Sequence, residues 1–391
     1  MEKKYVLPKG FKSAGIQGQI KPGKIDTGLI FSETPCDCTA FFTKNKLKSA
    51  HILLDQKRVN NKIRAVYANS GNANAFTGQQ GVDNIIEIGK VVAKTLNVPE
   101  NSVLFAATGI IGKQLPLDIM VKNAPVVCNA LSAKDDNYPK AIMTTDKFRK
   151  VRSSVLKMGN KTVTVSAVGK GAGMISPDMA TLLVFLMTDA VIDKKLLREA
   201  AKEALEYSFN RITVDGDMSP NDTVMCLANG QAGNKKISLK GKDYTAFKKA
   251  VSDAFYGIAE DMVSDGEGAT KVVKVEIINS KTKAAAKKAA LRIANSQLVK
   301  CAFFGESLNM GRILSAIGQT GVNVDLNSIS IDIGGYRAVE KGKLITGDAL
   351  KKVLKQDKIH LLIDFKQGKE KHYILASDLT YDYVRENADY S

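Results

Sequence analysis

The chain has 391 residues, of which 44% are hydrophobic, so it can bury the core of one large or two ordinary domains. Its 57 Lys and Arg exceed its 40 Asp and Glu, but the basic residues are scattered along the chain and Trp is absent, which argues against a nucleic-acid partner. The five cysteines have no metal-ligand spacing, and the sequence lacks a signal peptide and an apolar membrane span, so we expect a cytoplasmic protein without a bound metal.

Helical and strand patterns alternate along the first half of the chain. Apolar residues three and four positions apart predict a buried helix over 83–96, which ends before Asn97-Val98-Pro99. Alternation of apolar and polar residues predicts a strand over 162–167. Asp193 is a candidate N-cap for the next helix, which carries apolar residues as far as Leu205.

The second half continues the mixture with a helix over 247–262 and strands over 273–277, 329–333 and 361–365. This order predicts an α/β or α+β fold. Strict alternation favours antiparallel or mixed sheets that are covered on one face. Neither an internal repeat nor a flexible linker divides the chain into independent domains.

The segment 169–190 reads GKGAGMISPDMATLLVFLMTDA, in which a glycine-rich loop leads into a buried strand. An ordinary turn before a core strand would explain it. The chemistry permits more, because a Thr hydroxyl needs a base before it can act as a nucleophile. Cleavage between Ala180 and Thr181 would supply that base as a new α-amino group, whose reference pKa is about 7.7–8.0. Thr181 is therefore the candidate nucleophile, and the Ala180-Thr181 bond is the candidate site of self-cleavage.

A second segment, VLFAATGIIG, places Thr108 and Gly109 at the end of an apolar run. A hydroxyl and an adjacent backbone N–H could stabilise the oxyanion of a tetrahedral intermediate. By itself, Thr-Gly after a strand would be an ordinary turn.

With both segments, the chain resembles over its full length the bifunctional glutamate N-acetyltransferase/ornithine acetyltransferase family of arginine biosynthesis. The segments that carry this resemblance are PKGFKSAGI, YANSGNANAFTG, ATGIIG, AIMTTD, KGAGMISPDMATLL, DGDMSPNDT, DGEGATK and YDYVRENADYS. The resemblance implies an αββα sandwich of the aminopeptidase/ornithine acetyltransferase type, similar to N-terminal nucleophile hydrolases. It also implies an α chain, 1–180, and a β chain, 181–391, which fold together as one body and assemble as two copies of each.

The resemblance assigns Thr181 as the nucleophile and Thr108 and Gly109 as oxyanion donors. The substrate contacts that it implies are Thr144, Lys170, Thr181, Glu267, Asn387 and Ser391. Lys170 would pair with a substrate carboxylate and Glu267 with the side-chain ammonium of ornithine. Without the motifs, Lys170 could be a surface lysine and Glu267 an ordinary turn carboxylate.

Two segments depart from the family pattern. Residues 306–313, ESLNMGRI, stand where the family usually has a segment like DPNWGRI, so the neighbouring surface could be shaped differently. Family members commonly end one residue further on, in a Thr that helps to bind substrate. Either Ser391 takes that role or a final residue is missing.

The implied reaction is a ping-pong transfer of acetyl from N-acetylornithine to glutamate, without a metal or resident cofactor. Acetyl-CoA remains open as a second donor. One alternative is an N-terminal nucleophile aminopeptidase or amidase, which would release its acyl group to water. Another is a non-catalytic binding protein, although the phosphate-loop spacing Gly-x-x-x-x-Gly-Lys-Ser/Thr is absent.

Overall fold

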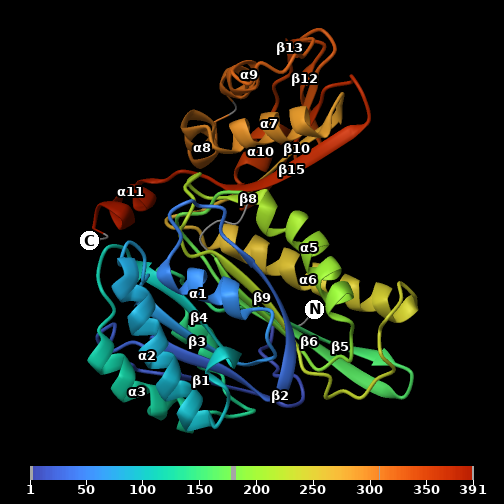
Figure 1. Cartoon of the computed structure of the whole chain (residues 1–391). Coiled ribbons are helices and arrows are strands. Elements are labelled where there is room, and N and C mark those ends of the chain that lie inside the picture. The colour runs from blue at the N-terminus through green and yellow to red at the C-terminus, as the bar shows by residue number, and fades with distance from the viewer. Residues whose placement is uncertain (1–2, 178–181, 308, 390–391) are drawn as a thin grey trace. The chain divides into compact units, whose positions relative to one another are not determined.

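The computed structural model describes residues 3–177, 182–307 and 309–389. Its internal contacts divide the chain into two compact units, which we describe separately (Figure 1). Unit 1 comprises Met1–Gly171, Asp178–Asn210 and Met218–Ala259, and unit 2 comprises Ala172–Pro177, Arg211–Asp217 and Glu260–Ser391.

Unit 1 is built on a mixed sheet, which has eight strands in the described part of the chain. The strands are β1 (Phe11–Ile16), β2 (Thr27–Phe42), β3 (Ile63–Asn72), β4 (Val103–Ile110), β5 (Lys150–Met158), β6 (Lys161–Lys170), β7 (Leu183–Thr188) and β9 (Thr223–Ala228). Their order is β4-β3-β2-β9-β7-β6-β5, and β1 pairs with β2 outside this path. The helices are α1 (Ala50–Arg58), α2 (Gly78–Leu96), α3 (Leu117–Asn129), α4 (Tyr138–Ala141), α5 (Lys194–Glu206) and α6 (Lys242–Ser264), which continues into unit 2.

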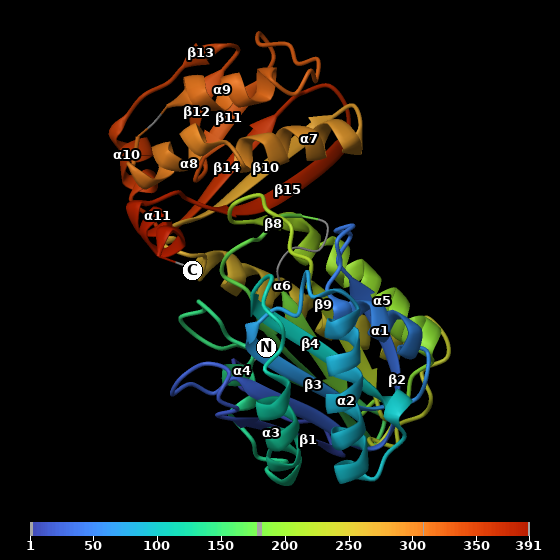
Figure 2. The same ribbon diagram turned by 60° about the vertical axis from the view of Figure 1, so that its left-hand side comes forward.

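The long strand β2 joins two halves of this sheet, because its first half pairs with β1 and β3 and its second half with β9. Buried side chains from both halves form one core, which includes Val66 and Leu104 from one half and Phe185 and Met225 from the other. A second core packs the outer face of β1 to β4 against α2 and α3. Figure 2 shows α2 and α3 on one side of the folded sheet and α5 and α6 on the other. Unit 1 is therefore a helix-sheet-sheet-helix sandwich, the arrangement that the family resemblance implies.

Unit 2 contains a second mixed sheet, with seven strands among the described residues, in the order β13-β12-β11-β14-β10-β15-β8. The strands are β8 (Ile212–Thr213), β10 (Val272–Ser280), β11 (Ser330–Ile333), β12 (Tyr336–Glu340), β13 (Lys343–Leu344), β14 (Lys358–Asp364) and β15 (Glu370–Ser377). The helices are α7 (Lys283–Ala294), α8 (Gln297–Phe304), α9 (Met310–Gly318), α10 (Asp348–Leu354) and α11 (Tyr381–Ala388). One apolar core joins β10, β11, β14 and β15 to α7, α9 and α10.

The predicted helices and strands are confirmed, with two differences. Asp193 occupies the N-cap position of α5, but its side chain makes no capping hydrogen bond and pairs instead with Lys236. The expectation of strands covered on one face holds for β10 and β14 and is wrong for β6, which is buried from Val165 to Lys170. The strand expected to be buried after the glycine-rich loop is β7, which is buried throughout. β7 lies inside the sandwich, where both faces of its sheet are covered.

Candidate functional site

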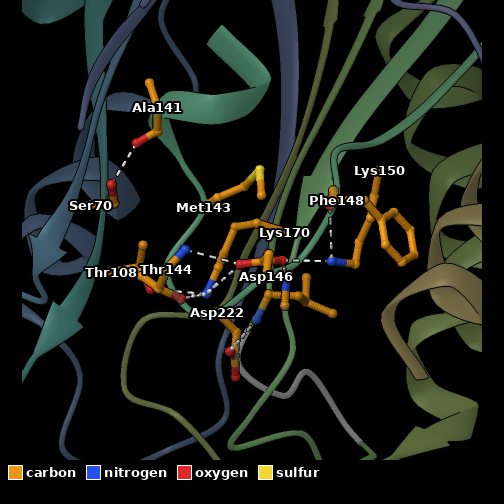
Figure 3. Close-up of polar contacts among 12 residues, drawn as sticks. Ser70, Thr108, Ala141, Met143, Thr144, Asp146, Phe148, Lys150, Lys170 and Asp222 are labelled. Carbon is orange, nitrogen blue, oxygen red and sulfur yellow. Dashed lines mark hydrogen bonds and ion pairs between the residues drawn. The ribbon is translucent and has the colours of Figure 1, made fainter. Parts of the chain in front are cut away.

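Lys170, the last residue of β6, lies at the centre of a buried polar cluster in unit 1 (Figure 3). Its ammonium donates hydrogen bonds to Thr144 Oγ1 at 2.8 Å and to Thr108 Oγ1 at 3.3 Å, and it lies 3.9 Å from Asp146 Oδ2. The Lys170 side chain is only 3% exposed. It is therefore a buried cation that links β4, β6 and the segment after α4, and the alternative of a surface lysine is wrong.

Asp146 is the anion that balances this cluster. Its side chain is fully buried, and its Oδ1 accepts hydrogen bonds from Lys150 Nζ at 2.7 Å and from the Gly171 amide at 2.8 Å. Its Oδ2 accepts a hydrogen bond from the Thr144 amide at 3.0 Å. Burial by itself would raise the pKa of Asp146, but the Lys170 and Lys150 ammonium groups outweigh it and hold that pKa below its ordinary value. Asp146 thus stays ionised and holds Thr144 and Lys170 in place.

Thr108 and Gly109 lie within β4, where the pairing with β3 shifts register at Gly71 and Asn72. Because an ammonium group only donates, the bond from Lys170 uses a lone pair of Thr108 Oγ1 and leaves the hydroxyl proton for another acceptor. Gly109 has a φ of +133°, and a Cβ there would lie 2.4 Å from the carbonyl carbon of Gly71. Only glycine fits this close approach of β4 to β3. A register shift of this kind changes the direction in which the neighbouring side chains point.

Asn221 and Asp222 connect the start of β7 to the end of β4. Asn221 Nδ2 donates to the carbonyl oxygens of Ala73 and Ala107, the residue before Thr108. Asp222 is fully buried, and its Oδ1 accepts a hydrogen bond from the Leu182 amide at 3.0 Å. Burial raises the pKa of Asp222 well above its ordinary value. In the described part of the chain its Oδ2 is also buried and has no hydrogen-bond partner.

Unit 2 brings Glu267 and Asn387 together. Asn387 Nδ2, on α11, donates to Glu267 Oε2 at 2.9 Å, and the Glu267 amide donates to the carbonyl of Ala172 at 3.0 Å. A Cβ on Gly173 would lie 2.3 Å from the Glu267 carboxylate, so only glycine lets this carboxylate pack against the loop. The two residues that the resemblance selected in this unit are therefore direct neighbours.

Asp215 adds a second carboxylate to this part of unit 2. Its Oδ2 accepts a hydrogen bond from the Met174 amide at 2.6 Å, and its Oδ1 accepts one from the Asp217 amide at 3.0 Å. Burial raises the pKa of Asp215 to about 6, and the negative charges of Asp217 and Glu267 act in the same direction. This region is suited to a cation.

The predicted site residues thus form two groups, each within one unit. Unit 1 gathers Thr108, Thr144 and Lys170, with Gly109 next to Thr108 in β4. Unit 2 gathers Glu267 and Asn387. Ala180, Thr181 and Ser391 lie outside the described residues, so their roles stay predictions.

Asp146, Lys150 and Asp222 take part in the unit 1 network, although the sequence analysis assigned them no role. Asp146 and Asp222 lie in the quoted segments AIMTTD and DGDMSPNDT, so the motifs contained this information. Each of these aspartates stands beside an apolar segment of the sequence. A carboxylate that is buried there requires charged or hydrogen-bonding partners, and this requirement could have marked both residues. Lys150 follows Asp146 by four residues but is not on a helix with it, so no periodicity reveals the pair.

Other kinds of site have less support in the described residues. There, no group of three or more His, Cys, Asp or Glu side chains is arranged to hold a metal ion. In residues 3–177, 182–307 and 309–389, no helix has both the length and the apolar character needed to cross a membrane.

Sequence comparisons with known proteins agree over nearly the whole chain. The model of the ArgJ family matches residues 12–391. The arginine biosynthesis bifunctional protein ArgJ of Caldanaerobacter subterraneus subsp. tengcongensis is 40% identical, with 100% of this chain and 99% of that protein covered. The glutamate N-acetyltransferase of Methanococcus maripaludis is 39% identical, with 99% and 97% covered. The crystal structure of ArgJ from Bacillus halodurans is 36% identical with a TM-score of 0.50, and covers 53% of this chain and 98% of its own.

Proposed function

This chain belongs to the ArgJ family, and on that premise we propose that it is an acetyltransferase of arginine biosynthesis that moves an acetyl group from N-acetylornithine to glutamate. The proposal includes self-cleavage between Ala180 and Thr181, after which Thr181 carries the acetyl group. A relative of nearly equal length bears the name glutamate N-acetyltransferase, which supports the choice of acceptor.

The observation that carries the proposal is the buried cluster of Thr108, Thr144, Asp146 and Lys170. The described chain that follows residues 178–181 lies beside this cluster. Lys170 pairs with Leu183 in the β6-β7 ladder, and the Leu182 amide bonds to Asp222. Residue 181 is two positions before Leu183, the first residue of β7, so the sequence tethers a nucleophile there to a strand that pairs with Lys170.

Activation begins when Thr181 Oγ attacks the carbonyl carbon of Ala180 and the peptide C–N bond breaks. The acyl group moves from nitrogen to oxygen and frees the Thr181 amine, and water then hydrolyses the ester to leave the Ala180 carboxylate. Strands before residue 180 and after residue 181 pair in the same sheet, β6 with β7 and β2 with β9. This pairing supports the expectation that the two fragments remain together as one body.

Transfer uses the new amine as the base. The amine takes the Thr181 hydroxyl proton, and Oγ attacks the acetyl carbonyl of N-acetylornithine. The Thr108 hydroxyl, whose oxygen already accepts from Lys170, donates to the oxyanion, together with the Gly109 amide. The C–N bond breaks, the Thr181 ammonium returns the proton to the leaving nitrogen, and ornithine departs. The glutamate amine attacks the acetyl ester in the same way and restores the hydroxyl.

The charges of Lys170 and Glu267 suit the roles that the family resemblance gives to each residue. Lys170 is a buried cation that can pair with an α-carboxylate, and Glu267 with Asp215 can receive the side-chain ammonium of ornithine. We further propose a cytoplasmic enzyme assembled from two α chains and two β chains, without a resident cofactor and with acetyl-CoA as a second acetyl donor.

The decisive experiment combines intact-mass analysis with an acetyl-transfer assay. We expect the purified protein to consist of two fragments that meet at Ala180/Thr181, and the Thr181→Ala variant to remain uncut. The cut protein should convert N-acetylornithine and isotope-labelled glutamate into labelled N-acetylglutamate and ornithine. Thr108→Ser, which retains the hydroxyl donor, is the control variant. We expect it to be cut at Ala180/Thr181 and to transfer acetyl groups.

Two results would contradict the proposal. A fully intact chain that transfers acetyl groups would exclude Thr181 as a self-activated nucleophile. Release of free acetate at the same rate with and without glutamate would assign the chain to the aminopeptidase or amidase class.

A further inference from the structure

The proposed self-cleavage needs a base that the uncut chain cannot take from Thr181 itself. In acetyl transfer the free α-amino group accepts the hydroxyl proton, but before the cut this nitrogen belongs to a peptide bond and is not basic. A second group must therefore accept the Thr181 hydroxyl proton in the uncut chain. The leaving nitrogen must also receive a proton when the C–N bond breaks.

Asp222 holds the chain directly after residue 181. Its Oδ1 accepts a hydrogen bond from the Leu182 amide at 3.0 Å, and the Thr223 amide donates to the Leu182 carbonyl at 3.0 Å. Leu182 is thus fixed through both its backbone groups. Three covalent bonds, whose lengths sum to about 4.3 Å, join its nitrogen to that of residue 181. The Asp222 carboxyl group is therefore within reach of the residue that is proposed to react.

The second oxygen of this carboxyl group is available to accept a proton. Asp222 Oδ2 is buried and has no hydrogen-bond partner in residues 3–177, 182–307 and 309–389. The nearby Thr43 hydroxyl donates its one proton to the Ser219 carbonyl at 2.7 Å, so it does not satisfy this oxygen. An unpaired buried oxygen is unfavourable for folding, and a role in the reaction is one reason for keeping it.

Burial and charge make Asp222 a better base than Asp146, and Figure 3 shows both aspartates with Lys170. Burial would raise the pKa of Asp146, but the ammonium groups of Lys170 and Lys150 hold it below its ordinary value, so this carboxylate accepts a proton poorly. Burial raises the pKa of Asp222 well above its ordinary value, and the opposing charge of Lys170 has a smaller effect. The ionised form of Asp222 therefore takes up a proton more readily.

We propose that Asp222 is the base of the self-cleavage step. Its Oδ2 takes the Thr181 hydroxyl proton while Oγ forms a bond to the Ala180 carbonyl carbon. The neutral carboxylic acid then donates this proton to the Thr181 nitrogen as the C–N bond breaks. The carboxylate is restored, and no proton is gained or lost. This assignment rests on the proposed function and adds a residue that acts before the cut.

Variants of Asp222 separate its chemistry from its packing. Asp222→Asn keeps the shape and the acceptor for the Leu182 amide but removes the base. Asp222→Ala leaves room for formate, a small carboxylate that can replace the missing group. The matched control is Asp189→Asn, because Asp189 is another buried carboxylate, which accepts backbone hydrogen bonds from Thr164 at 2.7 Å and from Lys9 at 3.0 Å. Thermal unfolding of each variant verifies that it folds.

Each chain is made by cell-free translation, and the fraction cut at Ala180/Thr181 is followed by intact mass after synthesis is stopped. We expect Asp222→Asn to be cut about 10²–10⁴-fold more slowly than the native chain, the range for loss of a positioned base, and Asp189→Asn to be cut at the native rate. Formate should accelerate the cutting of Asp222→Ala and leave Thr181→Ala uncut. Cutting of Asp222→Asn at the native rate would overturn the proposal, as would a folded Asp222→Ala chain that formate does not accelerate.

The native chain provides a test that does not depend on a folded variant. The ionised form of Asp222 acts, and burial raises its pKa above the ordinary Asp value of about 3.9, with Lys170 as its charged neighbour. The rate of self-cleavage should therefore rise with pH as Asp222 loses its proton. A rate that stays constant between about pH 4 and about pH 8 would contradict this role.

Acetyl transfer by the same chains separates this inference from the proposed function. Asp222→Ala that was cut in formate and then freed of it should transfer acetyl from N-acetylornithine to glutamate, because the Thr181 amine now serves as the base. Loss of transfer in that cut variant would give Asp222 a role after the cut and overturn the assignment.

The two proposals can also fail independently. If the native chain is cut and transfers acetyl, and the Asp222 variants are cut equally fast, this inference fails and the proposed function stands. If the native chain is cut with the help of Asp222 but does not transfer acetyl, the proposed function fails and this inference stands. A native chain that stays uncut would overturn both.

Discussion

Replacing Asp146 by Asn tests whether this residue neutralises the buried cations of the cluster. The carboxylate and its partner Lys150 are both fully buried, and Lys170 is 3% exposed. The amide of Asn has nearly the same shape but no charge, and its nitrogen would face groups that also donate. The two buried ammonium groups of Lys150 and Lys170 would then lose the negative charge of Asp146.

Removing one partner of a buried ion pair costs about 3–5 kcal/mol, because it leaves an uncompensated buried charge. We expect Asp146→Asn to lower the free energy of unfolding by this amount, a large share of the roughly 5–15 kcal/mol that stabilises a typical protein. Because the folded-state pKa of Asp146 is lowered, its contribution is present above its unfolded pKa of about 3.9. It is lost as the pH falls further, so the difference between native and variant should shrink in acid.

The assay is urea unfolding at pH 7 and at pH 3, performed in the Thr181→Ala background so that each protein is one continuous chain. Asp136→Asn is the matched control, because it makes the same substitution in an exposed pair with Arg149. We expect that control to cost about 0–1 kcal/mol. If Asp146→Asn destabilised the protein no more than Asp136→Asn, Asp146 would not act as the buried counterion.

Three further predictions concern β4 and unit 2. Thr108→Val should lower single-turnover acetyl transfer by about 10²–10³-fold, since it removes one oxyanion donor, and an unchanged rate would exclude that role. Gly109→Ala should cost about 2–4 kcal/mol in urea unfolding, through both its positive φ and its contact with Gly71, whereas Gly112→Ala, with φ +86° and open space, should cost about 1 kcal/mol. Equal costs would refute the contact. Burial raises the pKa of Asp215 to about 6, so the native protein should lose about 1–2 kcal/mol relative to Asp215→Asn as pH rises from about 4 to 6, and a constant difference would contradict this.

Local patterns in the sequence were sufficient for most of the secondary structure. The apolar period of 83–96 lies within α2, and Asn97 ends that helix in the left-handed conformation. The alternation over 273–277 lies within β10, whose burial pattern follows it. Both predictions succeed because helix and strand periodicity depend on which side of a single element faces the core.

Local patterns failed where a second layer covers a strand. The alternation over 162–167 predicts a strand covered on one face, whereas β6 is buried from Val165 to Lys170, because its sheet lies between the opposite half of the folded sheet and a layer of helices. Asp193 has the right residue type and backbone conformation for an N-cap, but Lys236 attracts its carboxylate. In both cases the outcome, burial of the strand or the partner of Asp193, depends on residues that are distant in the sequence.

The sequence by itself determined the candidate chemistry, through the hydroxyl, amide, cationic and acidic groups of its motifs, and the resemblance assigned the family. Only the tertiary structure decided which of these groups meet. Lys170 lies 62 residues from Thr108, and Asn387 lies 120 residues from Glu267, yet each pair is joined by a hydrogen bond. The role of Asp146 emerged in the same way. The physical reason is that contacts between distant segments depend on how sheets and helices pack, which periodicity within one segment does not encode.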